Sequence, residues 1–144
     1  MQAHLRLARP VTDLERTVAM YRSGLGLTEL GRFEDHDGFD GVMLGVAGLD
    51  YHFEFTKRRG HPVMPAPTAE DLAVFYLPDP DEWQVVCRSM LDAGFVEVDS
   101  FNPYWRERGR SFADHDGYRI VLERATWQDA AGGAAPAGTG GSRT

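Results

Sequence analysis

The stretch DLERTVAMYRSGLGL (residues 13–27) has a counterpart in DEWQVVCRSMLDAGF (residues 81–95), and thirteen residues separate the aspartate from the glycine in both. Each stretch begins at an aspartate suited to open a helix and continues with apolar residues at helical spacing. Each follows one strand-like run and precedes three more. The pattern predicts an α+β fold in which a βαβββ module occurs twice.

The chain divides into modules at a proline-rich segment. Module one is expected at residues 4–56 and module two at 71–127, joined by a linker at 57–70 that contains three prolines. Together they make one domain, 1–127. Residues 128–144 are mostly small and polar, so we expect a disordered tail. Residues 102–105, between the sixth and seventh strands, read as a loop.

Composition narrows the function classes. The net charge of -7 argues against nucleic acid or an anionic membrane as a partner. The single cysteine, Cys87, excludes an internal disulfide framework and is expected to be a buried helix residue. The sequence contains no 18-residue apolar run and no signal-peptide pattern, which favours a cytoplasmic protein.

Alternation assigns faces to the strands. In residues 51–56, three aromatic residues share one face, and His52, Glu54 and Thr56 share the other. In the first strand, His4 and Arg6 share one face, and Leu5 and Leu7 the other. We expect the apolar faces to pack on the helices, which leaves the polar faces to line a concavity.

Several motifs, taken in order, resemble those of one superfamily. They are Val11-Thr12-Asp13-Leu14, the helix end at 21–27, the strand at 52–55, Ala93-Gly94-Phe95 and the closing run at 114–122. The ordered set resembles the vicinal oxygen chelate superfamily, which includes glyoxalases, bleomycin-resistance proteins and extradiol dioxygenases. The resemblance implies that the paired modules form a cup-shaped half-barrel around a ligand site.

The resemblance also implies four positions at which metal-binding residues are expected. Metal-dependent members usually place histidines in strands one and five and glutamates in strands four and eight. In this chain the four positions hold Arg6, Glu54, Leu72 or Val74, and Val121, so one ligand of four remains. We therefore expect no metal cofactor. The alternative is a rearranged site for a divalent ion such as Zn, Ni, Mn or Fe.

The candidate site residues each have a structural alternative. Arg6 and Glu54 either orient a polar ligand or hold the cup closed as an ion pair. His52 is either a ligand contact or base, or a residue of the rim. The aromatic candidates either contact a ligand or cover a sheet edge. The full set of candidate ligand-binding residues is Arg6, His52, Glu54, Tyr76, Tyr104, Trp105 and Val121, and the donors of the alternative metal site are Glu54, His52 and His4.

Two further motifs read as ordinary structure. The sequence Asp-His-Asp-Gly occurs at 35–38 and again at 114–117, and both copies are expected to be turns between strands. They lack the remaining ligands of a calcium loop. The run Lys57-Arg58-Arg59 is expected to be a solvated stretch, with a contact to a charged substrate as the alternative.

The sequence favours a binding protein over an enzyme. The first hypothesis is a metal-free small-molecule binding protein of the bleomycin-resistance type, which sequesters an aromatic or natural-product ligand. The alternative is a divalent-metal-dependent lyase, isomerase or dioxygenase of the glyoxalase type, with a rearranged site around Glu54. A third is a metal-free enzyme in which Arg6 polarises a carbonyl. A homodimer is also expected, and the modules of each cup can come from one chain or from two.

Overall fold

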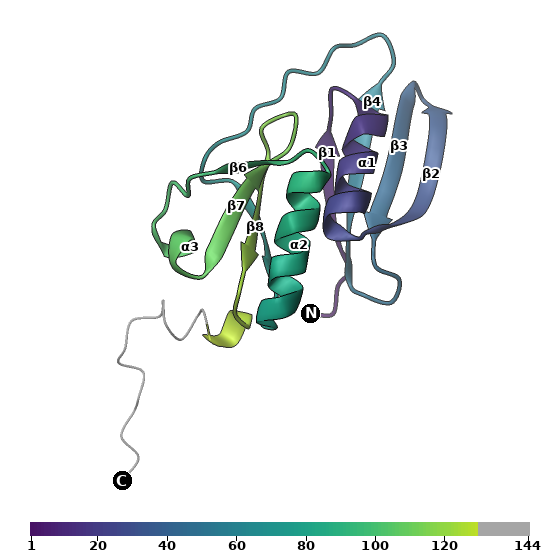
Figure 1. Cartoon of the computed structure of the whole chain (residues 1–144). Coiled ribbons are helices and arrows are strands. Elements are labelled where there is room, and N and C mark those ends of the chain that lie inside the picture. The colour runs from purple at the N-terminus through teal and green to yellow at the C-terminus, as the bar shows by residue number, and fades with distance from the viewer. Residues whose placement is uncertain (130–144) are drawn as a thin grey trace.

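The computed structural model describes residues 1–129 of the 144-residue chain. Eight strands and three helices make up two successive βαβββ modules (Figure 1), and residues 127–129 are helical as well. Module one consists of β1 (Leu5–Pro10), α1 (Leu14–Leu25), β2 (Thr28–His36), β3 (Phe39–Gly45) and β4 (Tyr51–Arg58). Module two consists of β5 (Leu72–Tyr76), α2 (Pro80–Asp92), β6 (Val96–Val98), α3 (Tyr104–Glu107), β7 (Gly109–Ala113) and β8 (Arg119–Glu123). The predicted α+β fold of two such modules is confirmed.

Each module builds one four-stranded mixed sheet. The strand orders are β1-β4-β3-β2 and β5-β8-β7-β6. The first and last strands of each module pair in parallel, and the other neighbours are antiparallel. The two sheets therefore repeat the same topology, and β1 and β5 are equivalent edge strands.

The helices begin and end at the local signals read from the sequence, with one shift. The Asp13 carboxylate accepts a hydrogen bond from the Arg16 amide, and α1 ends at Gly26, whose φ is +69°. In module two the capping residue is Asp79 rather than Asp81, because Pro80 fits the first helical turn and the Asp79 side chain reaches the Asp81 amide.

The two modules pack through their helix-bearing sides. Figure 1 shows α1 and α2 side by side, in front of the two sheets. Gly24 permits this approach, because a Cβ there would lie 2.9 Å from the Met90 sulfur. The Phe75 ring of β5 lies 6.2 Å from the Phe53 ring of β4. The apolar faces of both sheets thus share one core, and their polar faces point away from it.

The prediction that β1 packs its leucines on the helices is wrong. Leu5 is 63% exposed and Leu7 is 38% exposed. Helix α1 contacts β3 and β4 instead, so the apolar face of the edge strand β1 is left open within one chain. The predicted burial of Cys87 is confirmed, since it is fully buried in α2.

Two other segments differ from the sequence interpretation. Residues 104–107 form one helical turn, α3, where a loop was predicted, and its backbone is supported by bonds from Trp105 to Asn102 and from Arg106 to Pro103. Strand β4 continues to Arg58, so the connection to module two begins later than predicted. Of the predicted tail, 128–144, all but its first two residues lie outside the described part of the chain.

Both Asp-His-Asp-Gly segments are at turns, as predicted, but they differ in their contacts. The first joins β2 to β3, with Asp35 and His36 as the last residues of β2. The second joins β7 to β8 and docks on module one. Its hydrogen bonds join Asp114 to the Tyr21 hydroxyl (2.8 Å), His115 to Thr17 (2.7 Å) and Asp116 to the Thr12 amide (3.0 Å).

Within residues 1–129, no helix has the length and apolar character that crossing a membrane requires.

Candidate functional site

The polar face of the first sheet brings four candidate residues together. Strands β1 and β4 pair in parallel with Arg6 opposite His52. The Arg6 guanidinium donates from Nε to His52 Nε2 at 2.8 Å and from Nη1 to Glu54 Oε2 at 3.0 Å. The other ring nitrogen of His52 lies 2.5 Å from His4 Nε2. Arg6 is therefore the centre of a cluster that also contains His4, His52 and Glu54.

The hydrogen bonds determine the protonation of His52. Because Arg6 can only donate, His52 Nε2 must accept and carry no proton, so Nδ1 carries the proton and donates to His4. Burial lowers the pKa of His52, the Arg6 charge and then the electrostatic effect of His4 lower it further, and Glu54 acts in the opposite direction. His52 is a neutral ring whose lone pair is already engaged.

The exposure of the cluster suggests a role other than stability. The Arg6 side chain is 50% exposed, and that of Glu54 is 15% exposed. An ion pair with this exposure contributes about 0–1 kcal/mol to folding. The hydrogen bonds of Arg6 use Nε and Nη1 and leave Nη2 without a partner among the described residues. The cluster thus presents a fixed cation with free donors at the surface.

His4, His52 and Glu54 do not fit a divalent ion as they lie. Arg6 occupies the Nε2 lone pair of His52 and an oxygen of Glu54, which an ion would need. Among residues 1–129, no group of three or more His, Cys, Asp or Glu side chains is arranged to hold a metal.

The polar face of the second sheet carries the remaining candidates. Strands β5 and β8 pair with Val74 opposite Val121 and Tyr76 opposite Glu123. Val121 is fully buried, so it offers no surface to a ligand in this conformation. Tyr104 and Trp105 come from α3, and their rings meet edge to face at 4.8 Å.

Glu123 is a residue that the sequence interpretation missed. It is 2% exposed, and its Oε2 has no hydrogen-bond partner in the described part of the chain. Burial raises its pKa, partly offset by the charge of Arg108. Glu123 lies two residues beyond Val121 on the same face of β8. Alternation along the strand therefore could have identified Glu123 as a candidate from the sequence.

Tyr76 and α3 surround this carboxyl group. Burial raises the pKa of Tyr76, and the charges of Tyr104 and Glu123 raise it further, which reflects their proximity. A Cβ at Gly109 would lie 2.8 Å from Glu123 Oε2, so glycine leaves the space that the carboxyl group fills. The contacts described above join these residues to one another, and none of these contacts involves Arg6.

Comparison with known proteins identifies the family. Residues 5–56 match the YycE-like N-terminal domain, and residues 70–124 match the YycE-like C-terminal domain. The YycE protein of Bacillus subtilis (strain 168) is 41% identical over 120 residues, which cover 83% of this chain and 86% of that protein. The chain belongs to the YycE-like family.

Solved structures agree with this family assignment. The crystal structure of a Bacillus subtilis YycE protein of unknown function superposes on 86% of this chain and 90% of its own, with a TM-score of 0.81 and 40% identity. The fosfomycin resistance protein FosX from Mesorhizobium loti matches with a TM-score of 0.67 at 15% identity, over 90% of this chain and 94% of its own. Leishmania major glyoxalase I matches with a TM-score of 0.70 at 19% identity, over 93% and 94%. The last two likenesses show the fold, and membership of the vicinal oxygen chelate superfamily is confirmed.

Proposed function

We propose that this YycE-like protein is a metal-free small-molecule binding protein whose ligand is anchored by Arg6. The observation that carries the proposal is the position of the guanidinium, which lies between His52 and Glu54 and takes up the donor atoms that an ion would use. A planar guanidinium with free N–H groups binds carboxylate, phosphonate or carbonyl oxygens with defined geometry.

The second sheet supplies the apolar part of the proposed site. Tyr76 and Trp105 are partly exposed aromatic residues on the other polar face, beside Tyr104. Aromatic side chains stack well on planar ligands. The proposed ligand is therefore an aromatic compound or natural product that carries an oxygen acceptor for Arg6.

A second copy of the chain is proposed to bring the two faces together. Within one chain the sheets share their apolar faces, so the Arg6 and Tyr76 faces diverge. Strands β1 and β5 each pair with one neighbour in the described residues, and Leu5 and Leu7 are exposed along β1. In a two-fold dimer, β1 of one protomer would approach β5 of its partner and place the two faces around one cup.

Calorimetry and tryptophan quenching against a compound panel test the proposal. We expect saturable binding of an aromatic acid or a related compound by the wild-type protein. Binding should weaken at least about tenfold in Arg6→Gln, which removes a charge-assisted hydrogen bond. Arg88→Gln is the matched control, because Arg88 is an exposed residue of α2. Turnover of the bound compound would overturn the binding function.

Elemental analysis separates this proposal from the enzyme alternative. A glyoxalase-type lyase, isomerase or dioxygenase would require Arg6 to leave the cluster so that His4, His52 and Glu54 could hold Zn, Ni, Mn or Fe. We expect no stoichiometric metal in the purified protein. About one equivalent in the wild type that is lost in Glu54→Ala would support the enzyme instead.

A further inference from the structure

A second cleft lies at the far end of the first sheet, beyond the carboxyl ends of β1 and β4. It has a volume of about 490 Å³. The residues that matter to its chemistry are Val11, Lys57, Arg58, His61, Pro62 and Val63. Lys57 follows Glu54, the nearest residue of the Arg6 cluster along β4, by three residues, which corresponds to about 10 Å. The cleft is therefore separate from the Arg6 cluster.

The walls of the cleft are held by backbone hydrogen bonds. The Val11 amide donates to Thr56 at 2.9 Å, and the Arg59 amide donates to Gly38 at 2.8 Å. Gly60 turns the chain with a φ of +71°, a conformation that favours glycine. These contacts fix the path of residues 57–61 before any ligand arrives.

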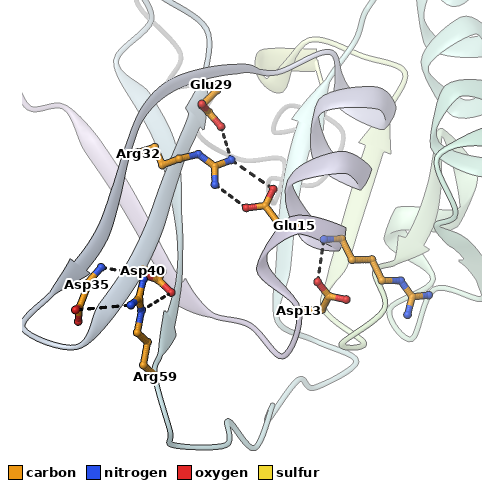
Figure 2. Close-up of polar contacts among 8 residues, drawn as sticks. Asp13, Glu15, Glu29, Arg32, Asp35, Asp40 and Arg59 are labelled. Atoms are coloured by element: carbon orange, nitrogen blue, oxygen red, sulfur yellow. Dashed lines mark hydrogen bonds and ion pairs between the residues drawn. The ribbon is translucent and has the colours of Figure 1, made fainter.

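The cations of the cleft lack carboxylate partners. Lys57 and Arg58 form no ion pair with the described residues, and Arg58 has only the Phe39 ring, 5.9 Å away. The next residue differs, because Arg59 binds Asp40 at 2.9 Å and Asp35 at 3.7 Å (Figure 2). The hydrogen bond from Arg59 is the largest cause of the lowered pKa of Asp40, and the charge of Lys57, which lies opposite Asp40 in the sheet, is the smallest of the causes.

The groove beside the cleft, which is lined in part by Arg32, Lys57 and Arg59, differs from it because carboxylates pair with its arginines. There Arg32 binds both Glu15 and Glu29, at 2.6 and 2.8 Å, as Figure 2 shows. The whole chain carries a net charge of -7. Two adjacent cations without a carboxylate partner therefore give this cleft positive charge on a chain of net negative charge, and a cavity of this size accommodates a small ligand.

Part of the cleft lining is apolar. Pro62 and Val63 line it together with the almost fully buried Val11. We propose that this cleft binds a small organic anion, a carboxylate or phosphate carried on a short apolar body, through Lys57 and Arg58. The assignment does not depend on the ligand of the Arg6 face. It gives a binding role to Lys57 and Arg58, the first two residues of the cationic run at 57–59.

Phenyl phosphate and its neutral counterpart, phenol, are suitable probes for amide-resolved NMR titration of the full chain. We expect phenyl phosphate to shift the amide signals of residues 57–63 and phenol to leave them unchanged. Lys57→Gln and Arg58→Gln should each weaken the binding of phenyl phosphate at least about tenfold. Arg88→Gln and Arg6→Gln should retain it, which separates this site from the proposed ligand site.

Three results would overturn the proposal. They are equal shifts with phenol, unchanged affinity in both cleft variants, or no shift at residues 57–63 at millimolar phenyl phosphate. Thermal unfolding of each variant shows whether the fold is retained. Both substitutions are at exposed residues, so we expect unfolding temperatures near that of the wild type. Inorganic phosphate, titrated separately, shows whether the apolar body contributes to binding.

Discussion

At the residue scale, Arg6 and Glu123 differ in whether their charged groups have hydrogen-bond partners. Arg6 donates to two neighbours and remains half exposed, so its charge is both fixed and accessible. Glu123 is almost fully buried, and its Oε2 has no partner among residues 1–129. A buried carboxylate without a partner is costly, so the carboxyl group favours its protonated form. These two groups respond to pH and substitution in different ways.

Arg6→Gln should raise the pKa of His52. The substitution removes the cation that holds the imidazole lone pair, and this cation opposes protonation. The rise should be partial, because burial is the largest cause of the lowered pKa and His4 remains. NMR titration of the histidine ring signals measures it. Arg16→Gln is the matched control and should leave the pKa of His52 unchanged; an unchanged value in Arg6→Gln would contradict the described cluster.

Glu123→Gln should stabilise the protein near neutral pH by about 1–3 kcal/mol. The raised pKa of Glu123 means that the folded state binds more protons than the unfolded state. The contribution of Glu123 to the free energy of unfolding is therefore highest below about pH 4, the pKa of the group in the unfolded chain. It falls as the pH rises through the pKa of Glu123 in the folded protein. Glutamine does not ionise, so the difference in free energy of unfolding between Glu123→Gln and the wild type should grow as the pH rises.

Urea unfolding at several pH values tests the Glu123 prediction. Glu70→Gln, at an exposed site, serves as the control and should change stability little at any pH. A variant that is less stable than the wild type at every pH would show that the carboxylate has a native partner. In that case α3 or a second chain would be the place to look for it.

At the element scale, the 114–117 turn joins the modules. The turn between β7 and β8 bonds to the loop before α1 and to α1 itself, through Asp116, His115 and Asp114. The Arg9 guanidinium of β1 lies 4.1 Å from the Tyr118 ring, and the Tyr118 hydroxyl accepts a bond from the Ala66 amide. One turn therefore fixes β1, α1 and the linker against module two.

Tyr21→Phe should destabilise the protein by about 1–3 kcal/mol. The fully buried hydroxyl donates to Asp114 at 2.8 Å, and its loss leaves a buried carboxylate oxygen without this donor. Tyr51→Phe is the matched control, because no hydrogen bond of its hydroxyl is found in the described residues. Urea unfolding of both variants gives the comparison, and equal stabilities would argue that the 114–117 turn contributes little to module docking.

At the scale of the whole molecule, the exposed leucines of the edge strand β1 favour association with a second copy of the chain. One chain leaves an apolar edge strand open while its two polar faces diverge. Exposed edge strands attract a further strand or chain. A two-fold dimer would cover Leu5 and Leu7 and form two equivalent sites.

Leu7→Lys should convert a dimer into monomers. In the dimer, the lysine ammonium would be buried in the interface without a partner. The free energy of removing this charge from water would exceed what the interface contributes to association. Size-exclusion chromatography with light scattering measures the mass, and Leu91→Lys, on the 43% exposed Leu91 of α2, is the control. A monomeric wild-type protein would contradict the assembly. In the variant, ligand binding at the Arg6 face should weaken together with the dimer.

The sequence by itself determined the two βαβββ modules, the alternation of faces along their strands, and the placement of His52 and Glu54 on one face of the same strand. These features follow from local signals: alternation along a strand, capping residues and the repeated spacing. The sequence placed the start of the second helix at Asp81, whereas the capping residue in the structure is Asp79. The error is small because the cap formed by Asp79 and Pro80 is also a local feature of the sequence.

Only the tertiary structure decided which surfaces are covered. Leu7 has the pattern of a core residue, yet it is exposed because α1 lies over β3 and β4. Glu123 looks like a surface residue, yet it is buried beside Gly109. The two Asp-His-Asp-Gly turns are identical in sequence, and only the second docks on α1. Burial and pairing depend on what a distant segment places against a residue, and no local pattern carries that information.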